Sequence, residues 1–151
     1  MLDLAAPAAA IGYAVGRIGC LTSGDGDYGI PSNVPWAMGF PNGIDPTPPG
    51  VRVHPTPIYE FIAGLIIGWW LWKQGGKKHG TGTVVGQYLL WTGIARFLVE
   101  FIRRNPKILL GLSNAQLASL GSVVAGAVLI WVASKRNKPA PTEPVEVAKA
   151  A

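Results

Sequence analysis

The residues best suited to chemistry are arginines and glutamates that stand inside apolar segments. Arg17 ends one such segment, Glu60 begins another, and a third contains Arg96 and Glu100 one helical turn apart. Charged side chains within membrane helices are costly, so they usually pair with one another or line a polar cavity. Arginine binds phosphate through paired N–H donors. The pattern therefore predicts a cluster of charged groups with a site for an anion.

A further arginine extends this cluster. Arg96, Glu100 and Arg103 are spaced by four and then three residues, which places them on one face of a helix. Arg17 and the basic segment at 103–107 add more positive charge than the two glutamates neutralise. Because lipid headgroups are the most abundant anions at a membrane surface, the sequence favours a polar-lipid site. An ion pair that ties helices together is the structural alternative.

The composition is that of a membrane protein. Hydrophobic residues make up 49% of the 151 residues and charged residues 14%, against roughly 25% charged in an ordinary soluble domain. The formal net charge of +5 comes from basic residues that flank apolar segments, as in membrane proteins, so nucleic acid is not expected as a partner. The single cysteine, Cys20, excludes an intrachain disulfide, and no CxxC or histidine cluster predicts a metal site.

Four apolar segments are candidates for membrane helices. The predicted spans are residues 4–20, 55–73, 82–102 and 115–134. Glycines at four-residue spacing allow such helices to approach closely, and the pairs are Gly12/Gly16, Gly64/Gly68 and Gly82/Gly86. Residues 21–54 are rich in Gly, Pro, Asn and Asp and predict one long loop of turns. The sequence thus predicts an all-α membrane protein with about four transmembrane helices.

Basic residues set the predicted orientation. Lys73, Lys77 and residues 135–138 lie on one side of a four-span chain, which the positive-inside rule makes cytoplasmic. Residues 1–138 then form one membrane-embedded domain, and the proline-rich residues 139–151 form a disordered cytoplasmic tail. Both ends of the chain are inside and the long loop is outside. The charged residues therefore gather at the outer face, where the basic segment after the third span breaks the rule.

Other polar residues near the same face are candidates for binding. His54 and Tyr59 precede Glu60, which also suits a helix start because a carboxylate there favours the helix dipole. His54 as an interfacial histidine and Tyr59 as a packing residue are the structural alternatives. Gln116, near the start of the last span, can donate to a headgroup or equally to a neighbouring residue. Asp25 stands among glycines, where aspartate more often forms turns.

Three ordered stretches resemble the prolipoprotein diacylglyceryl transferase family of the bacterial inner membrane. They are residues 16–25 followed by Tyr28-Gly29, the His-Pro-Thr-Pro-Ile-Tyr-Glu segment at 54–60, and residues 96–103. The resemblance covers nearly all of residues 16–134 and corresponds to roughly the last four helices of a seven-helix enzyme. It implies transfer of the diacylglyceryl group of phosphatidylglycerol to the lipobox cysteine of a prolipoprotein signal peptide, without a metal or organic cofactor.

The resemblance also implies roles for individual residues. Arg17 and Arg96 match arginines associated with the lipid phosphate and with catalysis, and Glu60 and Glu100 match essential acidic positions. The expected substrate-binding residues besides the two arginines are His54, Tyr59, Asp25, Arg103 and Gln116. The site is expected to face the periplasm of a multi-pass inner-membrane protein.

The chain departs from the family pattern at several positions. Cys20 replaces the usual Asn, and Thr92 replaces the usual Tyr. The stretch from Asp25 to Gly29 is one residue longer, so either Asp25 or Asp27 can fill the acidic position.

The N-terminal half of the family, with a His-Gly-Gly segment that supplies a proposed base, has no counterpart in this sequence. A fragment that is inactive alone is therefore one expectation. A noncatalytic protein that binds anionic lipid headgroups or a partner helix bundle is the main alternative, and a transporter subunit is a weaker one.

Overall fold

A computed structural model describes residues 2–75, 77, 81–104 and 111–136. These residues form no strand, and their four helices are α1 (Leu2–Ser23), α2 (Thr56–Gly75), α3 (Thr83–Glu100) and α4 (Asn114–Arg136). The four predicted helices are confirmed, with ends that differ from the prediction by at most three residues. The predicted tail at 139–151 lies outside the described residues.

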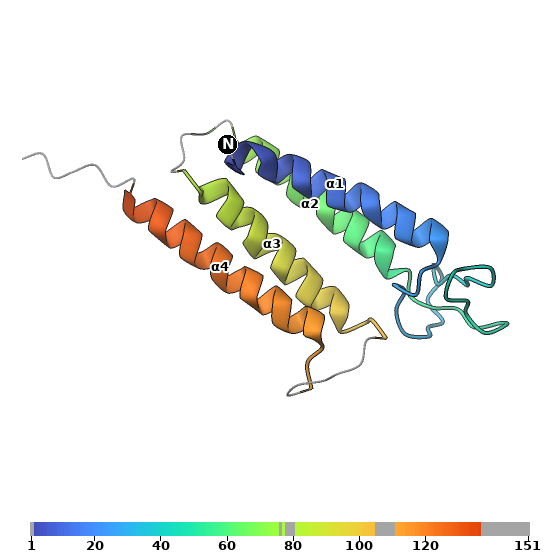
Figure 1. Ribbon diagram of the computed structural model, residues 1–151. Coiled ribbons are helices and arrows are strands. Elements are labelled where there is room, and N and C mark those ends of the chain that lie inside the picture. Colours follow the sequence, from blue (N-terminus) through green and yellow to red (C-terminus); the bar gives the residue numbers. More distant parts are fainter. Residues whose placement is uncertain (1, 76, 78–80, 105–110, 137–151) are drawn as a thin grey trace, which may run out of the picture.

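The helices run alternately in opposite directions, as Figure 1 shows. α1 packs mainly on α2 and α3 mainly on α4, while smaller contacts join α2 and α1 to α3. The C-terminal ends of α1 and α3 and the N-terminal end of α2 lie at the same end of the bundle, beside the long loop (Figure 1). This arrangement brings the predicted charged residues to one end of the molecule.

Apolar side chains cover the outward faces of all four helices. Side chains that are more than half exposed include Val15, Ile66, Leu98, Val124 and Trp131. α1 and α4 are long and apolar enough to cross a membrane, and only 17% of the most apolar stretch of α4 is buried. A core helix of a soluble protein would bury this surface, so the exposed faces support a membrane location.

Glycines allow the closest helix contacts. A Cβ atom on Gly126 of α4 would lie 2.6 Å from the carbonyl oxygen of Gly86 and 2.7 Å from the nitrogen of Leu90, both on α3. Gly64 of α2 faces α1 in the same way, at 2.9 Å from Ala14 Cβ. Gly64, Gly68 and Gly86 therefore fulfil the predicted packing role. Gly12, Gly16 and Gly82 have no neighbour near their Cβ positions and do not.

The loop at 24–55 is held against the helix ends by backbone hydrogen bonds. The Gly29 N–H donates to the His54 carbonyl (2.8 Å), and the Ile30 N–H donates to the Ile102 carbonyl (2.8 Å). A Cβ atom on Gly29 would lie 2.8 Å from the Ile102 oxygen, so the close approach requires glycine. Inside the loop, the buried Tyr28 hydroxyl donates to the Asp45 carbonyl (2.7 Å), and burial raises the pKa of this phenol.

The opposite end of the bundle has its own cross-helix contact. Asp3, in the first turn of α1, accepts hydrogen bonds from the backbone N–H groups of Gly82 (2.6 Å) and Val85 (2.9 Å). Free N–H groups at the start of a helix need such acceptors, and a carboxylate there also favours the helix dipole. Asp3 thus caps α3 from a different helix.

A methyl group at the α3–α4 contact tests this packing. We expect Gly126→Ala to lower the free energy of unfolding by about 1–3 kcal/mol, because the added carbon overlaps backbone atoms that cannot move aside. The measurement is thermal unfolding of the purified protein in detergent. Gly121→Ala, on the same helix with open space at its Cβ position, is the matched control. Equal unfolding midpoints for the two variants would contradict the proposed contact.

Candidate functional site

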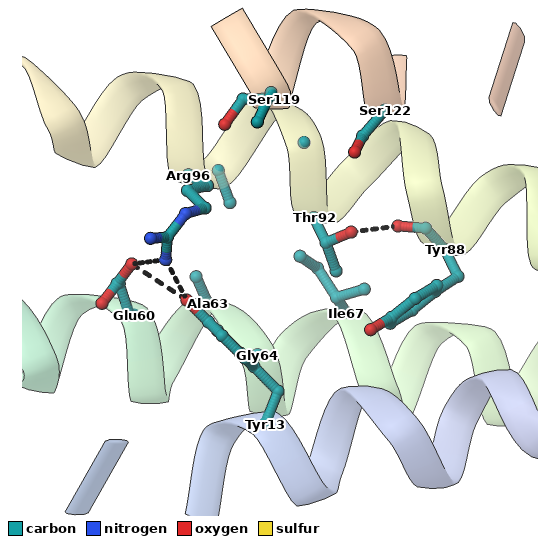
Figure 2. Close-up of a pocket in the computed structure, with 13 residues that line it drawn as sticks. Tyr13, Glu60, Ala63, Gly64, Ile67, Tyr88, Thr92, Arg96, Ser119 and Ser122 are labelled. Atoms are coloured by element: carbon teal, nitrogen blue, oxygen red, sulfur yellow. Dashed lines mark hydrogen bonds and ion pairs between the residues drawn. The ribbon is translucent and has the colours of Figure 1, made fainter. Parts of the chain in front are cut away.

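The Glu60 carboxylate is the centre of the charged cluster. Its side chain is 2% exposed, and the Arg17 Nε atom lies 2.8 Å from Oε2. Arg96 Nη1 approaches Oε1 at 3.4 Å from α3, as Figure 2 shows. Glu60 therefore joins α1, α2 and α3 through one carboxylate. The predicted convergence of Arg17, Glu60 and Arg96 is confirmed.

Tyr13 is a member of the cluster that sequence reasoning missed. Its hydroxyl donates to Glu60 Oε1 (2.9 Å). The Tyr13 hydroxyl oxygen in turn accepts hydrogen bonds from Arg17 Nε (3.1 Å) and Nη2 (2.9 Å) and from Arg96 Nη1 (3.1 Å). The available signal was its position, because Tyr13 lies one helical turn before Arg17 in a segment otherwise rich in Ala and Gly.

Asp27 supplies the acidic group of the long loop. Its carboxylate pairs with Arg17 Nη1 and with Arg103 Nη2. Its backbone carbonyl accepts a hydrogen bond from the Thr56 hydroxyl at the start of α2. Of the two aspartates that the sequence left open, Asp27 is therefore the one that contacts the arginines. Asp25 is exposed and accepts a hydrogen bond from the Asp27 N–H (3.2 Å), so its binding role stays a prediction.

Among the described residues, three side chains near Asp27 are close enough together to be considered as metal ligands. Ligand atoms of Cys20, Asp25 and Asp27 lie within 4.8 Å of one another. Arg17 Nη1 contacts both the Cys20 sulfur (3.6 Å) and Asp27. A guanidinium group at this distance repels a cation, so these residues suit an arginine partner better than a metal.

Glu100 belongs to a second part of the network. Its Oε1 atom accepts a hydrogen bond from the Ser113 hydroxyl (2.7 Å), and Arg103 Nε lies 3.7 Å from Oε2. Arg103 follows the end of α3, so the prediction of one helical face for all three charged residues is wrong in detail. The chain turns after Glu100, yet the Arg103 side chain reaches both Glu100 and Asp27.

Gln116 serves the start of α4. Its Oε1 atom accepts a hydrogen bond from the Ser113 N–H (3.0 Å), while the Gln116 N–H donates to the Ser113 hydroxyl (3.2 Å). This reciprocal pair is a capping box. Of the two alternatives for Gln116, contact with a neighbouring residue is the one observed, and headgroup binding stays a prediction.

The charges of the network balance. The ion pairs involve three arginines and three carboxylates: Arg17, Arg96, Arg103, Asp27, Glu60 and Glu100. These six groups carry no surplus of positive charge, because Asp27 provides a third carboxylate. The predicted surplus also counted Arg104, which lies over the Tyr28 ring, and Lys107, which lies outside the described residues, so it stays a prediction. Of the three arginines in the network, Arg96 is the most accessible: its side chain is 36% exposed, against 9% for Arg17 and 6% for Arg103. Within the network, Arg96 is therefore the arginine most open to an anion.

A cavity of about 190 Å³ lies beside Arg96, between the α1–α2 pair and the α3–α4 pair. Figure 2 shows Tyr13, Glu60 and Arg96 at one end of it and Thr92 and Tyr88 farther along. The remaining lining consists of small or apolar residues and two serines: Ala63, Gly64, Ile67, Gly93, Ala95, Ala118, Ser119 and Ser122. A charged end and a largely apolar body suit an amphiphilic ligand.

His54 and Tyr59 form a separate cluster on the loop side. The His54 Nδ1 atom lies 3.0 Å from the Tyr59 hydroxyl, and Trp36 Nε1 donates to the same hydroxyl (2.7 Å). Neither His54 nor Tyr59 lines the cavity. Their predicted role in substrate binding therefore stays a prediction.

Asp27 and Asp25 provide a matched pair for testing the network. We expect Asp27→Asn to lower the free energy of unfolding by about 3 kcal/mol, because Arg17 and Arg103 lose a charged partner in a buried setting. Asp25 lies two residues earlier and is exposed, so Asp25→Asn should leave the unfolding midpoint nearly unchanged. Thermal unfolding in detergent measures both. A larger effect of Asp25→Asn would show that the wrong aspartate was assigned.

Comparison with known proteins shows which family the chain resembles. The chain is 37% identical to a phosphatidylglycerol–prolipoprotein diacylglyceryl transferase of Pseudomonas syringae pv. syringae over 144 residues, which cover 91% of this chain and 52% of the relative. The protein of the same name from Leptospira interrogans is 36% identical over an alignment of 168 residues, which covers 90% of this chain and 52% of the relative. The chain thus spans about half the length of the curated relatives it matches.

The family match covers most of the chain. Residues 1–132 match the family model of prolipoprotein diacylglyceryl transferase, a stretch that contains α1, α2, α3, the long loop and nearly all of α4. All six charged groups of the network and the cavity beside Arg96 lie within it. The chain therefore belongs to the prolipoprotein diacylglyceryl transferase family.

Proposed function

We propose that this chain binds phosphatidylglycerol and takes part in transferring its diacylglyceryl group to the lipobox cysteine of a prolipoprotein signal peptide. The observation that carries this proposal is the cavity with Arg96, Tyr13 and Glu60 at its charged end. Family membership supports the class of reaction. The curated relatives named for this activity are about twice as long, so the chain is proposed to supply one half of the working enzyme.

The proposed setting is the bacterial inner membrane, with all four helices as spans and residues 1–138 as the embedded domain. Lys73 and Lys135 lie at the end of the bundle away from the charged network, each with its ammonium group over an indole ring, at 3.9 Å for Trp69 and 3.7 Å for Trp131. Tryptophan and lysine are typical of membrane interfaces, and lysine favours the cytoplasmic side. The network and the long loop would then face the periplasm.

The lipid phosphate is proposed to bind at Arg96. This guanidinium contacts Glu60 at 3.4 Å, a long distance for a charge-assisted hydrogen bond. A phosphate oxygen can replace that weak contact without exposing Glu60, because Arg17 holds the other carboxylate oxygen at 2.8 Å. The acyl chains would then lie along the apolar part of the cavity. Arg17 remains the buried partner that fixes the carboxylate.

In the proposed reaction, the thiolate sulfur attacks the glyceryl carbon that carries the phosphate ester. A carbon–sulfur bond forms, the carbon–oxygen bond breaks, and glycerol phosphate leaves with the bonding electron pair. Positive groups close to the leaving phosphate stabilise the charge that develops on it, which is the role proposed for Arg96. The thiol proton must pass to a base, because the thiolate is the nucleophile.

That base is assigned to the half of the relatives that this chain does not span. Glu60 contacts Arg17, Arg96 and Tyr13, and Asp27 contacts Arg17 and Arg103. Each carboxylate is thus already occupied by positively charged partners. Lipid binding without catalysis is the second candidate function, and the limited coverage of the relatives favours it for the chain alone.

A reconstituted assay tests the transferase proposal. The chain is produced in bacterial membranes together with the N-terminal half of the Pseudomonas syringae relative, and supplied with phosphatidylglycerol and a lipobox peptide. We expect a thioether-linked diacylglyceryl peptide by mass spectrometry. Arg96→Ala should reduce its formation at least about tenfold, since charge-assisted contacts contribute about 1.5–3 kcal/mol. Arg52→Ala, an exposed arginine of the loop, is the control expected to retain activity.

Two outcomes separate the candidate functions. If the combined halves yield no thioether while the chain alone binds phosphatidylglycerol in preference to phosphatidylcholine, the transferase proposal fails and lipid binding stands. If Arg96→Ala turns over as fast as Arg52→Ala, the phosphate assignment is wrong even when product forms. Native mass spectrometry of the purified chain measures lipid binding.

Cysteine labelling tests the proposed orientation. In a Cys20→Ala background, Asn42→Cys and Lys77→Cys each place one thiol at an exposed position at opposite ends of the bundle. A membrane-impermeant maleimide applied to intact spheroplasts should label the cysteine at position 42. The cysteine at position 77 should react only after permeabilisation. The reverse pattern would invert the orientation and place the network on the cytoplasmic side.

A further inference from the structure

We infer that Tyr13 is a positioning residue of this site, whose hydroxyl holds Arg96 at the charged end of the cavity. The inference rests on the proposed function only for what Arg96 binds. The positions of the side chains themselves come from the contacts of α1, α2 and α3. Tyr13 is thus assigned a role that acts through another residue.

The hydrogen-bonding capacity of a phenol explains this role. A tyrosine hydroxyl has one proton to donate and lone pairs that accept. Tyr13 gives its proton to Glu60 Oε1 at 2.9 Å, so its lone pairs are left for the guanidinium groups of Arg17 and Arg96. The neutral oxygen thereby lies between two positive side chains that would otherwise repel each other. Its partners Arg17, Glu60 and Arg96 lie on α1, α2 and α3.

Arg96 depends on this oxygen more than Arg17 does. Its contact with Tyr13 is 3.1 Å, shorter than its 3.4 Å contact with Glu60. Arg17 also pairs with Asp27 and reaches Glu60 at 2.8 Å. Loss of the Tyr13 hydroxyl therefore leaves Arg17 in place but leaves Arg96 with its longer contact. The expected result is an Arg96 side chain that spends less time at the charged end of the cavity.

Tyr13→Phe removes the hydroxyl and keeps the ring. The ring also carries the Arg17 guanidinium, whose Cζ atom lies 4.9 Å from the ring centroid, so packing on α1 is retained. A suitable control is Tyr28→Phe, which removes another buried hydroxyl with a 2.7 Å hydrogen bond, to the Asp45 carbonyl inside the loop. Tyr28→Phe loses one hydrogen bond, whereas Tyr13→Phe loses those with Glu60, Arg17 and Arg96. Of the two tyrosines, only Tyr13 contacts Arg96.

The first measurement needs no lipid. Phenylglyoxal modifies accessible guanidinium groups, and peptide mass spectrometry of the full chain in detergent follows the modification rate at Arg96. We expect Tyr13→Phe to raise this rate several-fold and Tyr28→Phe to leave it unchanged. An unchanged rate in Tyr13→Phe, or an equal rise in the control, overturns the inference whatever the ligand of the cavity is.

The second measurement uses phosphatidylglycerol and a double-variant cycle. We expect Tyr13→Phe to weaken binding about five- to tenfold, and to weaken it little further once Arg96→Ala is present, because the effect passes through Arg96. Fully additive losses overturn the inference. If the unmodified chain does not bind phosphatidylglycerol at all, the proposed function fails, and the phenylglyoxal rates still decide the role of Tyr13.

Discussion

The structure depends on the buried carboxylate of Glu60 and the arginines that neutralise it. Removing one partner from a buried ion pair typically costs about 3–5 kcal/mol, because a charge is left without compensation. The partners come from α1 and α3, so Glu60 on α2 makes three helices depend on one another. Tyr13 and Asp27 complete the arrangement. The same ion pairs therefore hold the three helices together and position the charged residues of the site.

The helices and their charged end were predictable from the sequence, whereas the loop contacts were not. Apolar length located each helix, and alternation of spans placed Arg17, Glu60 and Arg96 at one end. The position of Asp27 depends on backbone pairing between the loop and the end of α3, which leaves no periodic pattern in the sequence. Tyr13 was missed because an aromatic residue in an apolar helix reads as packing. The function of Gln116 emerged only from its pairing with Ser113.

Thr92 illustrates how a departure from the family pattern gains meaning from the structure. The resemblance to the family implies a tyrosine one helical turn before Arg96, and this sequence has Thr92 there. Thr92 lines the cavity, and Tyr13 on α1 lines the same cavity with its hydroxyl in contact with Arg96. A phenol hydroxyl is thus present beside this arginine, but from a different helix. Position-by-position comparison of one helix could not have located it.

The cap that Asp3 provides for α3 gives the bundle a second fixed point. α1 and α3 run in the same direction (Figure 1). Asp3, at the start of α1, contacts Val85, and Tyr13, midway along α1, contacts Arg96. Ten residues separate the two contacts on α1 and eleven on α3, which at about 1.5 Å per residue gives nearly equal axial lengths. The two helices are therefore held together at two points along their length. A shift of one helix along the other by a single turn would break both contacts together.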